Sequence, residues 1–313
     1  MSWVLRLKRT LKLDLLVAYK EHENDPRIPE VCADMAKEMG EGRYYADLSE
    51  RMAQFELTLL DWAEAHKGAR KYVAFADKCW PAFPSQFGFE PCYVNSRLAA
   101  RGIPVSCEVD IYGALSEYIG LCISNDAVTL LDINNSVPQY IYDEDIKGKY
   151  DYKLTDTFMG FHCGNTPACK MCDSRAVKYQ LIQHRLLEPE GSEPDFTRGT
   201  LEGDIAASDI TFYRLQCNSE GELVSYVAEG EVLDVPTRSF GGIGIFAIKR
   251  DGKILPSRTD RGQLPASRCS YVRTLWKGIL RSSENSLDLM LKKNRLQPAG
   301  WCKISYRESM GNK

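Results

Sequence analysis

The stretch Gly102-Ile103-Pro104-Val105-Ser106-Cys107-Glu108 decides the fold of the first half of this chain. Its apolar run predicts a buried strand over residues 103–109. The apolar spacing of the sequence that follows, IYGALSEYIGLCI, predicts a helix over residues 111–123. A strand over 71–77 and a helix over 91–100 come before them with short links. The order strand, helix, strand, helix is typical of a parallel α/β unit.

Three further helices are expected ahead of this unit, over residues 3–21, 30–39 and 45–66. The last has the clearest periodicity, because apolar side chains recur at steps of three and four residues: Leu48, Met52, Phe55, Leu59, Trp62 and Ala63. We therefore predict a parallel, Rossmann-like α/β domain over residues 1–124.

The pattern changes after Asn125, where short strand-like runs separated by turn signals replace the alternation of strands and helices. Asn218-Ser219-Glu220-Gly221 stands between two such runs and is typical of an antiparallel hairpin loop. One helix is expected over residues 174–187. We predict a mostly antiparallel, β-barrel-like domain over residues 125–248, so the whole fold is α/β followed by α+β. The strand-like runs cover residues 128–131, 158–161, 210–215, 223–235 and 241–248.

The bulk composition is that of a globular protein with a substantial core. The chain has 313 residues, of which 44% are hydrophobic, and a net charge of −3, which argues against a general nucleic-acid binder. Its eleven cysteines lack framework spacing and indicate thiols of a reducing compartment. No apolar run approaches the length of a membrane span, and the charged N-terminal residues do not resemble a signal peptide. We therefore expect a cytoplasmic protein without a membrane partner.

Residues 249–313 differ from the rest in charge. They carry 15 Lys and Arg against 5 Asp and Glu. Two interpretations are open: a basic tail that binds an acidic partner, and a divergent terminus that is not under the same folding constraints. The poor apolar periodicity of the segment favours the second interpretation.

Two carboxylates close apolar runs, 24 residues apart in the chain. Glu108 ends the run described above, and Asp132 ends Val128-Thr129-Leu130-Leu131-Asp132. A carboxylate at the end of a buried strand is costly unless it meets a partner or a metal. The pair therefore suggests an oxygen-rich site for a hard cation. The alternative is two strand ends that meet solvent or a helix N-terminus.

His162 is a further candidate, because it stands at the end of a strand and enters the Gly/Pro turn that ends at Pro167. It could reach a ligand, or it could be an ordinary hydrogen-bonded histidine. With Cys163, Cys169 and Cys172 it also forms an H-C-x5-C-x2-C pattern, which could hold a structural zinc in an interaction module. The pattern lacks a second spaced pair, so ordinary thiols are the simpler interpretation.

Asn95 and Arg97 open the helix expected after Pro91. They could face a substrate pocket or serve in helix capping. We include both, together with Asn134, among the predicted substrate-binding residues.

Several segments resemble the L-fucose/L-arabinose isomerase family, in the right order and with sensible spacing. The resemblance covers roughly residues 30–248. It is carried by PCYVNSRLA (91–99), PVSCEVDIYGA (104–114), LLDINN (130–135) and FHCGN (161–165).

The resemblance implies an α/β middle domain followed by a β-rich C-terminal domain. It implies aldose–ketose interconversion of a monosaccharide through an enediolate, with Mn²⁺ or Mg²⁺ as cofactor, in a homo-oligomer. Glu108 matches the glutamate that binds the metal and exchanges the substrate proton. Asp132 matches the aspartate ligand, and His162 is similar to a histidine that lines the same site. The resemblance thus implies Glu108 and Asp132 as catalytic residues and Glu108, Asp132 and His162 as metal ligands.

Two departures from the family pattern shape the expectation for activity. The family's first domain has no counterpart ahead of this sequence, and no histidine follows His184, although the family carries a histidine ligand near its C-terminus. We therefore expect a truncated and impaired isomerase. The alternative is a non-catalytic carbohydrate-binding or assembly protein that retains the isomerase scaffold.

Overall fold

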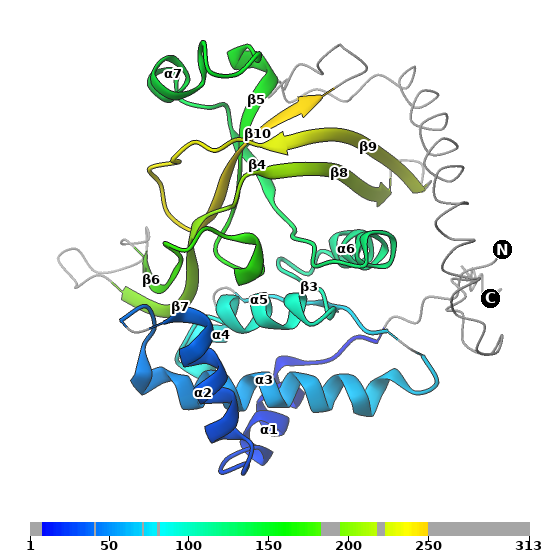
Figure 1. Cartoon of the computed structure of the whole chain (residues 1–313). Helices are drawn as coiled ribbons and strands as arrows, with labels where there is room; N and C mark the ends of the chain where they lie inside the picture. Colours follow the sequence, from blue (N-terminus) through cyan, green and yellow to red (C-terminus); the bar gives the residue numbers. More distant parts are fainter. Residues whose placement is uncertain are drawn as a thin grey trace, which may run out of the picture.

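A computed structural model describes residues 8–40, 42–70, 72–79, 82–182, 195–217 and 223–249. Its first half is mainly helical, with α1 (Lys12–Glu21), α2 (Ile28–Met39) and α3 (Ala46–Lys67) below the rest of the molecule in Figure 1. α2 and α3 confirm two of the three helices that the apolar periodicity predicts. The helix expected over 3–21 is confirmed only from Lys12, since residues 8–11 are not helical and residues 1–7 lie outside the described part. Among the described residues, no helix combines the length and the apolar character needed to span a bilayer.

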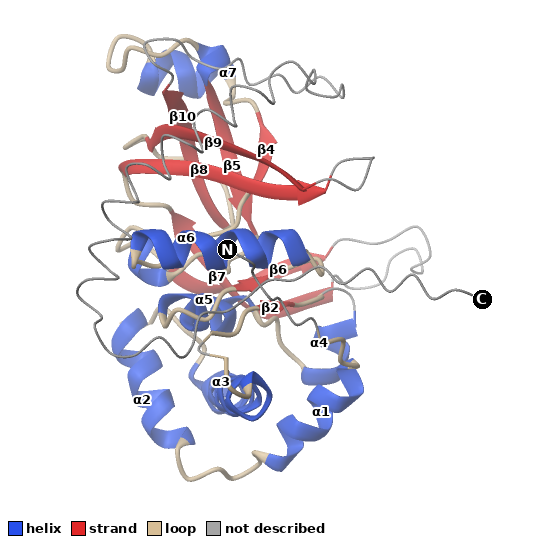
Figure 2. Ribbon diagram, turned by 90° about the vertical axis from the view of Figure 1, so that its right-hand side faces the viewer, coloured by secondary structure: helices blue, strands red, loops and turns tan. Residues whose placement is uncertain are grey.

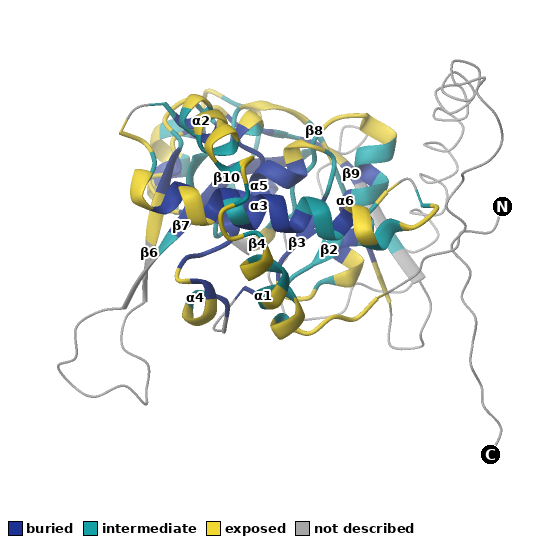
Figure 3. Ribbon diagram, turned by 90° about the horizontal axis from the view of Figure 1, so that it is seen from below, coloured by how far each residue is buried: buried dark blue, intermediate teal, exposed yellow. Residues whose placement is uncertain are grey.

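The core of the helical half forms around α3. Leu48, Met52, Phe55 and Leu59 occupy one face of this helix and are at most 5% exposed. The rings of Phe83, Phe87 and Phe89, from α4 (Ala82–Phe87) and the loop after it, pack edge-on to Phe55 at centroid distances of 5.0–5.9 Å. Such aromatic pairs add to the stability gained from burial alone. Figure 3 shows buried residues along α3 and along α5 (Cys92–Ala100), which packs beside it.

The predicted strand–helix–strand–helix unit is present in the expected order. β2 (Phe75–Ala76) and β3 (Val105–Ser106) pair in parallel, and α5 and α6 (Ile111–Ser124) follow them. Both strands are only two residues long. This single short pair supports a parallel α/β arrangement but is too small to show a Rossmann-like sheet. The Rossmann-like sheet stays a prediction.

The second half forms a curled, half-barrel sheet in which most pairs are antiparallel, as predicted. The central strand is β10 (Gly242–Lys249), which pairs antiparallel with β5 (Thr157–His162) and with β9 (Leu223–Val232) and parallel with the end of β7 (Asp195–Asp204). Figure 2 shows β5, β9 and β10 above α6, with β7, α5 and α3 below α6. The other strands are β4 (Asp132–Asn135), β6 (Ala176–Ile182) and β8 (Ser208–Cys217).

Short helical turns lie next to the sheet, and two clusters of buried apolar side chains pack against it. One cluster lies around Ile243 and Ile245, and the other stacks Phe158 on Phe246 at 5.4 Å between ring centroids. The turns are α7 (Gln139–Ile141), a π-helical turn (Tyr142–Ile146) and two 3₁₀ turns (Leu154–Asp156 and Ala168–Lys170).

Two of the secondary-structure predictions are wrong. The helix expected over 174–187 is strand β6 as far as Ile182, and residues 183–187 lie outside the described part. β6 pairs with β7 along its whole length, and the alternating Val177, Tyr179 and Leu181 themselves favour a strand. The strand expected over 128–131 is irregular, so Asp132 begins β4 and does not end a strand. The hairpin loop over 218–221 and the basic tail after Lys249 also lie outside the described residues.

The turn after β5 docks the sheet onto the helical half. Asn165 donates its amide N–H to the carbonyl of Val105 at 3.2 Å, and Ser96 in α5 accepts the N–H of Ala168 at 3.1 Å. Gly164 within this turn has φ +131°, and a Cβ there would lie 2.3 Å from the carbonyl oxygen of Leu201. Only glycine fits this close approach of two backbones.

Replacing Gly164 by Ala is expected to lower the free energy of unfolding by about 3 kcal/mol, because backbone strain and a steric clash add together. Gly148 is a matched control, since its φ of +77° is also left-handed but no atom lies within 4 Å of a Cβ built there. Gly148→Ala should therefore show the strain alone, about 1 kcal/mol. Urea denaturation measures both changes. Equal losses in the two variants would contradict the close approach.

Candidate functional site

Glu108 lies in a strained turn directly after β3. Glu108 and Val109 have φ values of 62° and 57°, in the left-handed region. This conformation is rare for any non-glycine residue and costly for a β-branched one. Hydrogen bonds hold the turn: the N–H of Val109 donates to the carbonyl of Asp77 at 2.9 Å, and that of Asp110 donates to Cys107 at 3.1 Å. The turn brings Glu108 out to solvent immediately after the buried Cys107.

Asp110 fastens the other end of this turn. Its side chain accepts the N–H of Gly113 at 2.8 Å and so caps α6. The guanidinium of Arg214 in β8 binds both of its oxygens, at 2.6 and 2.9 Å. Burial raises the pKa of Asp110, but these hydrogen bonds outweigh burial and leave the pKa below its usual value. The strained turn is therefore anchored to both halves of the chain.

His162 ends β5 and is 6% exposed. Its Nδ1 lies 2.9 Å from the backbone N–H of Cys163 and accepts that hydrogen bond, so the neutral ring carries its proton on Nε2. Burial lowers the pKa of His162, while the negative charges of Asp132 and Glu108 oppose this shift. Both predicted metal carboxylates thus oppose the effect of burial on the same imidazole.

The three side chains do not gather around a single point in this structure. Asp132 pairs with Phe161 across the sheet, so these two side chains share a face, while His162 alternates to the other face. Glu108, Asp132 and His162 do not form a group with ligand atoms all within 4.8 Å of one another. The chemistry of the donors fits a hard cation at the two exposed carboxylates. His162, in this tautomer, offers an N–H that suits a sugar oxygen. The predicted metal set stays a prediction.

Arg97 lies away from the carboxylates, inside the helical half. The side chain is 3% exposed, and its three nitrogens bind Glu56 at 2.5 Å, Glu38 at 2.9 Å and Asp34 at 2.6 Å. Glu56 is fully buried. These contacts assign Arg97 a structural role, and its substrate contact stays a prediction.

Asn95 is 1% exposed, and neither of its amide atoms has a hydrogen-bond partner among the described residues. It lines a space of about 470 Å³, in part open to solvent, together with Trp62, Phe75 and Asp77. Asp77 lies between this space and the strained turn. Its backbone carbonyl accepts the N–H of Val109, and burial, together with the negative charge of Glu108, raises the pKa of its carboxyl. Asn95 thus lies behind the candidate site. The side chain of Asn134 falls outside the described part.

The zinc alternative gains no support from the geometry. Cys163 and Cys172 are half-buried and Cys169 is exposed. In the described part of the chain, no three of His162 and these thiols bring their ligand atoms within 4.8 Å of one another. The nine described cysteines form no disulfide with one another, as expected for thiols without framework spacing.

Comparison with known proteins shows what this chain is similar to. The L-fucose isomerase C-terminal domain family matches residues 160–253. Sulfoquinovose isomerases of Priestia aryabhattai and Priestia megaterium are 32% identical over 228 residues, which are 72% of this chain and 44% of each relative. The enzyme of the same name from Alkalicoccus urumqiensis is 26% identical over 200 residues, 59% of this chain and 38% of its own. Residues 160–253 thus resemble the C-terminal domain of L-fucose isomerase, and the chain is similar to sulfoquinovose isomerases over as much as 72% of its length. It spans less than half the length of these relatives.

Sequence reasoning missed residues that support the site of this L-fucose isomerase-like chain. Glu117 is 3% exposed on α6 and accepts a short hydrogen bond from the hydroxyl of Ser106. A signal was present in the sequence: Glu117 lies three residues after Ala114 and three before Gly120, on the small-residue face of the predicted helix. Arg214 carried no such signal, because its partner Asp110 is 104 residues away.

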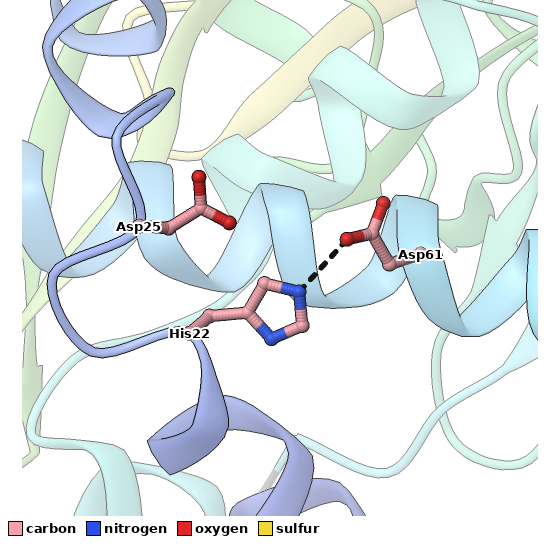
Figure 4. Close-up of side chains that lie close together, drawn as sticks. All are labelled: His22, Asp25 and Asp61. Carbon is pink, nitrogen blue, oxygen red and sulfur yellow. Dashed lines mark hydrogen bonds and ion pairs between the residues drawn. The ribbon is translucent and has the colours of Figure 1, made fainter.

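A second cluster of possible metal ligands in the L-fucose isomerase-like chain lies far from Glu108. His22, Asp25 and Asp61 bring their ligand atoms within 4.8 Å of one another (Figure 4). His22 Nδ1 lies 2.8 Å from the carbonyl of Ala18, an acceptor, so Nδ1 carries a proton, and Nε2 lies 3.0 Å from Asp61. Arg27 binds both carboxylates, at 2.7 and 2.6 Å. The guanidinium of Arg27 and the imidazole of His22 thus pair with the two carboxylates, and the cluster is a hydrogen-bonded network of side chains.

The His22–Asp61 pair is expected to stabilise the protein only when His22 is protonated. Burial lowers the pKa of His22, but the hydrogen bonds to Ala18 and Asp61 outweigh burial and leave the pKa raised. The stabilisation is therefore complete below the unfolded-state pKa of about 6.5 and is lost as the pH rises through the higher folded-state pKa. We expect His22→Gln to cost about 0.5–1 kcal/mol at low pH and progressively less as the pH rises.

Urea titrations of the wild type and the variant across the pH range measure this difference. His66→Gln is the matched control, because His66 Nδ1 also contacts a carbonyl one helical turn earlier, at 2.8 Å, but has no carboxylate partner among the described residues. A pH-independent cost of His22→Gln would contradict the ion pair.

Proposed function

We propose that this chain acts as a metal-dependent aldose–ketose isomerase on a monosaccharide. Support comes from the family relationship and from relatives that are named sulfoquinovose isomerases. The observation that carries the proposal is the left-handed turn at Glu108 and Val109. Strain of this kind persists only where surrounding contacts enforce it, and it is concentrated at active sites.

Glu108 and Asp132 would hold Mn²⁺ or Mg²⁺, because carboxylate oxygens are the ligands that hard cations prefer. The ion would supply Lewis-acid stabilisation of the negative charge that develops on the sugar oxygens. Glu108 is exposed and can take a proton from the carbon beside the sugar carbonyl and return it to the neighbouring carbon, through an enediolate.

We further propose a cytoplasmic homo-oligomer in which β2 and β3 belong to a Rossmann-like sheet. Exposed apolar side chains beside the two carboxylates support a contact with a second subunit. Val109 is 48% exposed beside Glu108, and Ile133 is 55% exposed beside Asp132. A second subunit that covers these residues would also exclude water from the carboxylates.

The test is an aldose-to-ketose assay with L-fucose, L-arabinose and sulfoquinovose, with and without added Mn²⁺. Conversion that depends on Mn²⁺ and disappears in the Glu108→Gln/Asp132→Asn double variant supports the proposal. Sugar binding without conversion at any Mn²⁺ concentration would replace it with the non-catalytic carbohydrate-binding function.

A further inference from the structure

α5 carries one buried amide side chain that lines a space inside the helical half of the molecule. Asn95 is 1% exposed, and its backbone N–H donates to the carbonyl of Pro91 at 2.8 Å, as in a regular helix. Neither amide atom of its side chain has a hydrogen-bond partner among the described residues. A buried amide without partners is costly, so folded proteins rarely contain one unless a ligand or an ordered water satisfies it.

The next two polar side chains of α5 are satisfied, so Asn95 is an exception within its own helix. Ser96 is fully buried and accepts the N–H of Ala168 at 3.1 Å. Arg97 binds three carboxylates. Poor packing of α5 therefore does not explain the unpartnered amide.

The walls of the space that Asn95 lines are mainly apolar, and three of them are aromatic. Phe55 is 1% exposed, while Trp62 and Phe75 are half-buried. Among the lining residues, Asp77 adds a carboxyl group and Thr10 adds a hydroxyl. The space is in part open to solvent, so a small molecule can enter it.

This lining selects the chemistry of a ligand. An amide offers a donor N–H and an acceptor oxygen side by side, and it pairs best with a group that offers the reverse. Aromatic walls pack well on a flat ring. A monosaccharide suits the space less, because most of its hydroxyl groups would face apolar walls without partners.

We propose that this space binds a small, neutral aromatic amide or lactam, whose donor and acceptor pair with the side chain of Asn95. The ring of the ligand would lie among Phe55, Trp62 and Phe75. This inference goes beyond the proposed isomerase function, since neither Glu108 nor Asp132 lines the space.

The experiment titrates benzamide into the full 313-residue chain by isothermal calorimetry, with two matched probes. Benzoate keeps the ring but is charged and offers only acceptors, and toluene keeps the ring without a polar group. We expect saturable binding of benzamide, at least about tenfold tighter than that of either probe, because both leave hydrogen bonds of the amide unmade.

Two variants test the role of the amide. Asn95→Leu, at similar volume, is expected to weaken benzamide binding by at least about tenfold and to raise the Tm of the ligand-free protein by about 2 °C, because an unsatisfied buried group is removed. Ser96→Ala is the matched control, since it removes a satisfied buried group of the same helix outside the space. It should lower the Tm and keep the affinity of the wild type.

Trp62 supplies a second readout that places the ligand. Its indole lines the space and stacks on His66 at 4.6 Å between ring centroids. Benzamide is expected to change the tryptophan fluorescence of the wild type but not that of Trp62→Phe, which keeps an aromatic wall.

The other outcomes overturn the inference. If benzamide binds no better than toluene, ordered water satisfies Asn95 and the site is wrong. If Asn95→Leu lowers the Tm as Ser96→Ala does, or leaves the affinity unchanged, the amide is not the recognition group. If L-fucose binds in place of benzamide and requires Asn95, the predicted substrate contact replaces this site. No readout uses catalysis, so failure of the proposed isomerase function would not change these results.

Discussion

Replacement of Glu108 by Gln is expected to lower kcat/KM for sugar isomerisation by about 10²–10⁴-fold, the contribution of a positioned acid–base group. The amide cannot take a proton from carbon, and it is a weaker ligand for a hard cation. Because Glu108 is exposed, we expect the free energy of unfolding to change by only about 0.5 kcal/mol. Steady-state assays at saturating Mn²⁺ and urea denaturation measure the two quantities.

Glu50→Gln is a suitable control for this prediction, because Glu50 is an exposed carboxylate on α3, in the helical half. It should keep the activity of the wild type. Unchanged kcat/KM in Glu108→Gln would remove the proton-transfer role from Glu108. A loss of activity accompanied by unfolding would instead assign Glu108 to the stability of the turn.

Replacement of Arg97 by Met is expected to lower the free energy of unfolding by about 3–5 kcal/mol, the cost of leaving a buried charge without its partner. The change leaves the fully buried Glu56 with one cationic partner among the described residues, Arg101. This side chain is 2.7 Å away and 40% exposed. It also removes the ion pairs of Asp34 and Glu38. Thermal and urea unfolding report the loss.

The control is Arg238→Met. Arg238 is 41% exposed and binds Asp145 at 2.8 Å, so its removal should cost only about 0–1 kcal/mol. If Arg97→Met folds as well as the control but loses sugar binding, the predicted substrate contact would displace the structural role.

The sequence predicted the helices and strands whose periodicity is set by local burial. The apolar spacing of Leu48, Met52, Phe55 and Leu59 predicts α3 directly. The short links between β2, α5, β3 and α6 predict that these elements form one parallel unit. The helix prediction over 174–187 overlooked a strand pattern. In β6, Val177, Tyr179 and Leu181 alternate with Lys178 and Gln180, and β7 pairs with the strand along its length.

The candidate site shows the same division. Glu108 was identifiable because a charge ends an apolar run, but the left-handed turn that exposes it was not, since Glu108 and Val109 are poor residues for that conformation. The carboxylate partners of Arg97 could not be predicted from the local sequence, because they are 41 to 63 residues away; its substrate contact stays a prediction. Asp132 was assigned to a strand end, although the strand begins there.

The central place of β10 in the sheet has a consequence for biosynthesis. β5, β7 and β9 all precede it in the chain, yet each hydrogen-bonds to it in the finished sheet. At about 5–20 residues per second, these strands leave the ribosome seconds before β10 does. Their unpaired edges can meanwhile join other nascent chains. Co-translational protection by a chaperone should therefore raise the yield of this protein more than lower temperature does after synthesis is complete.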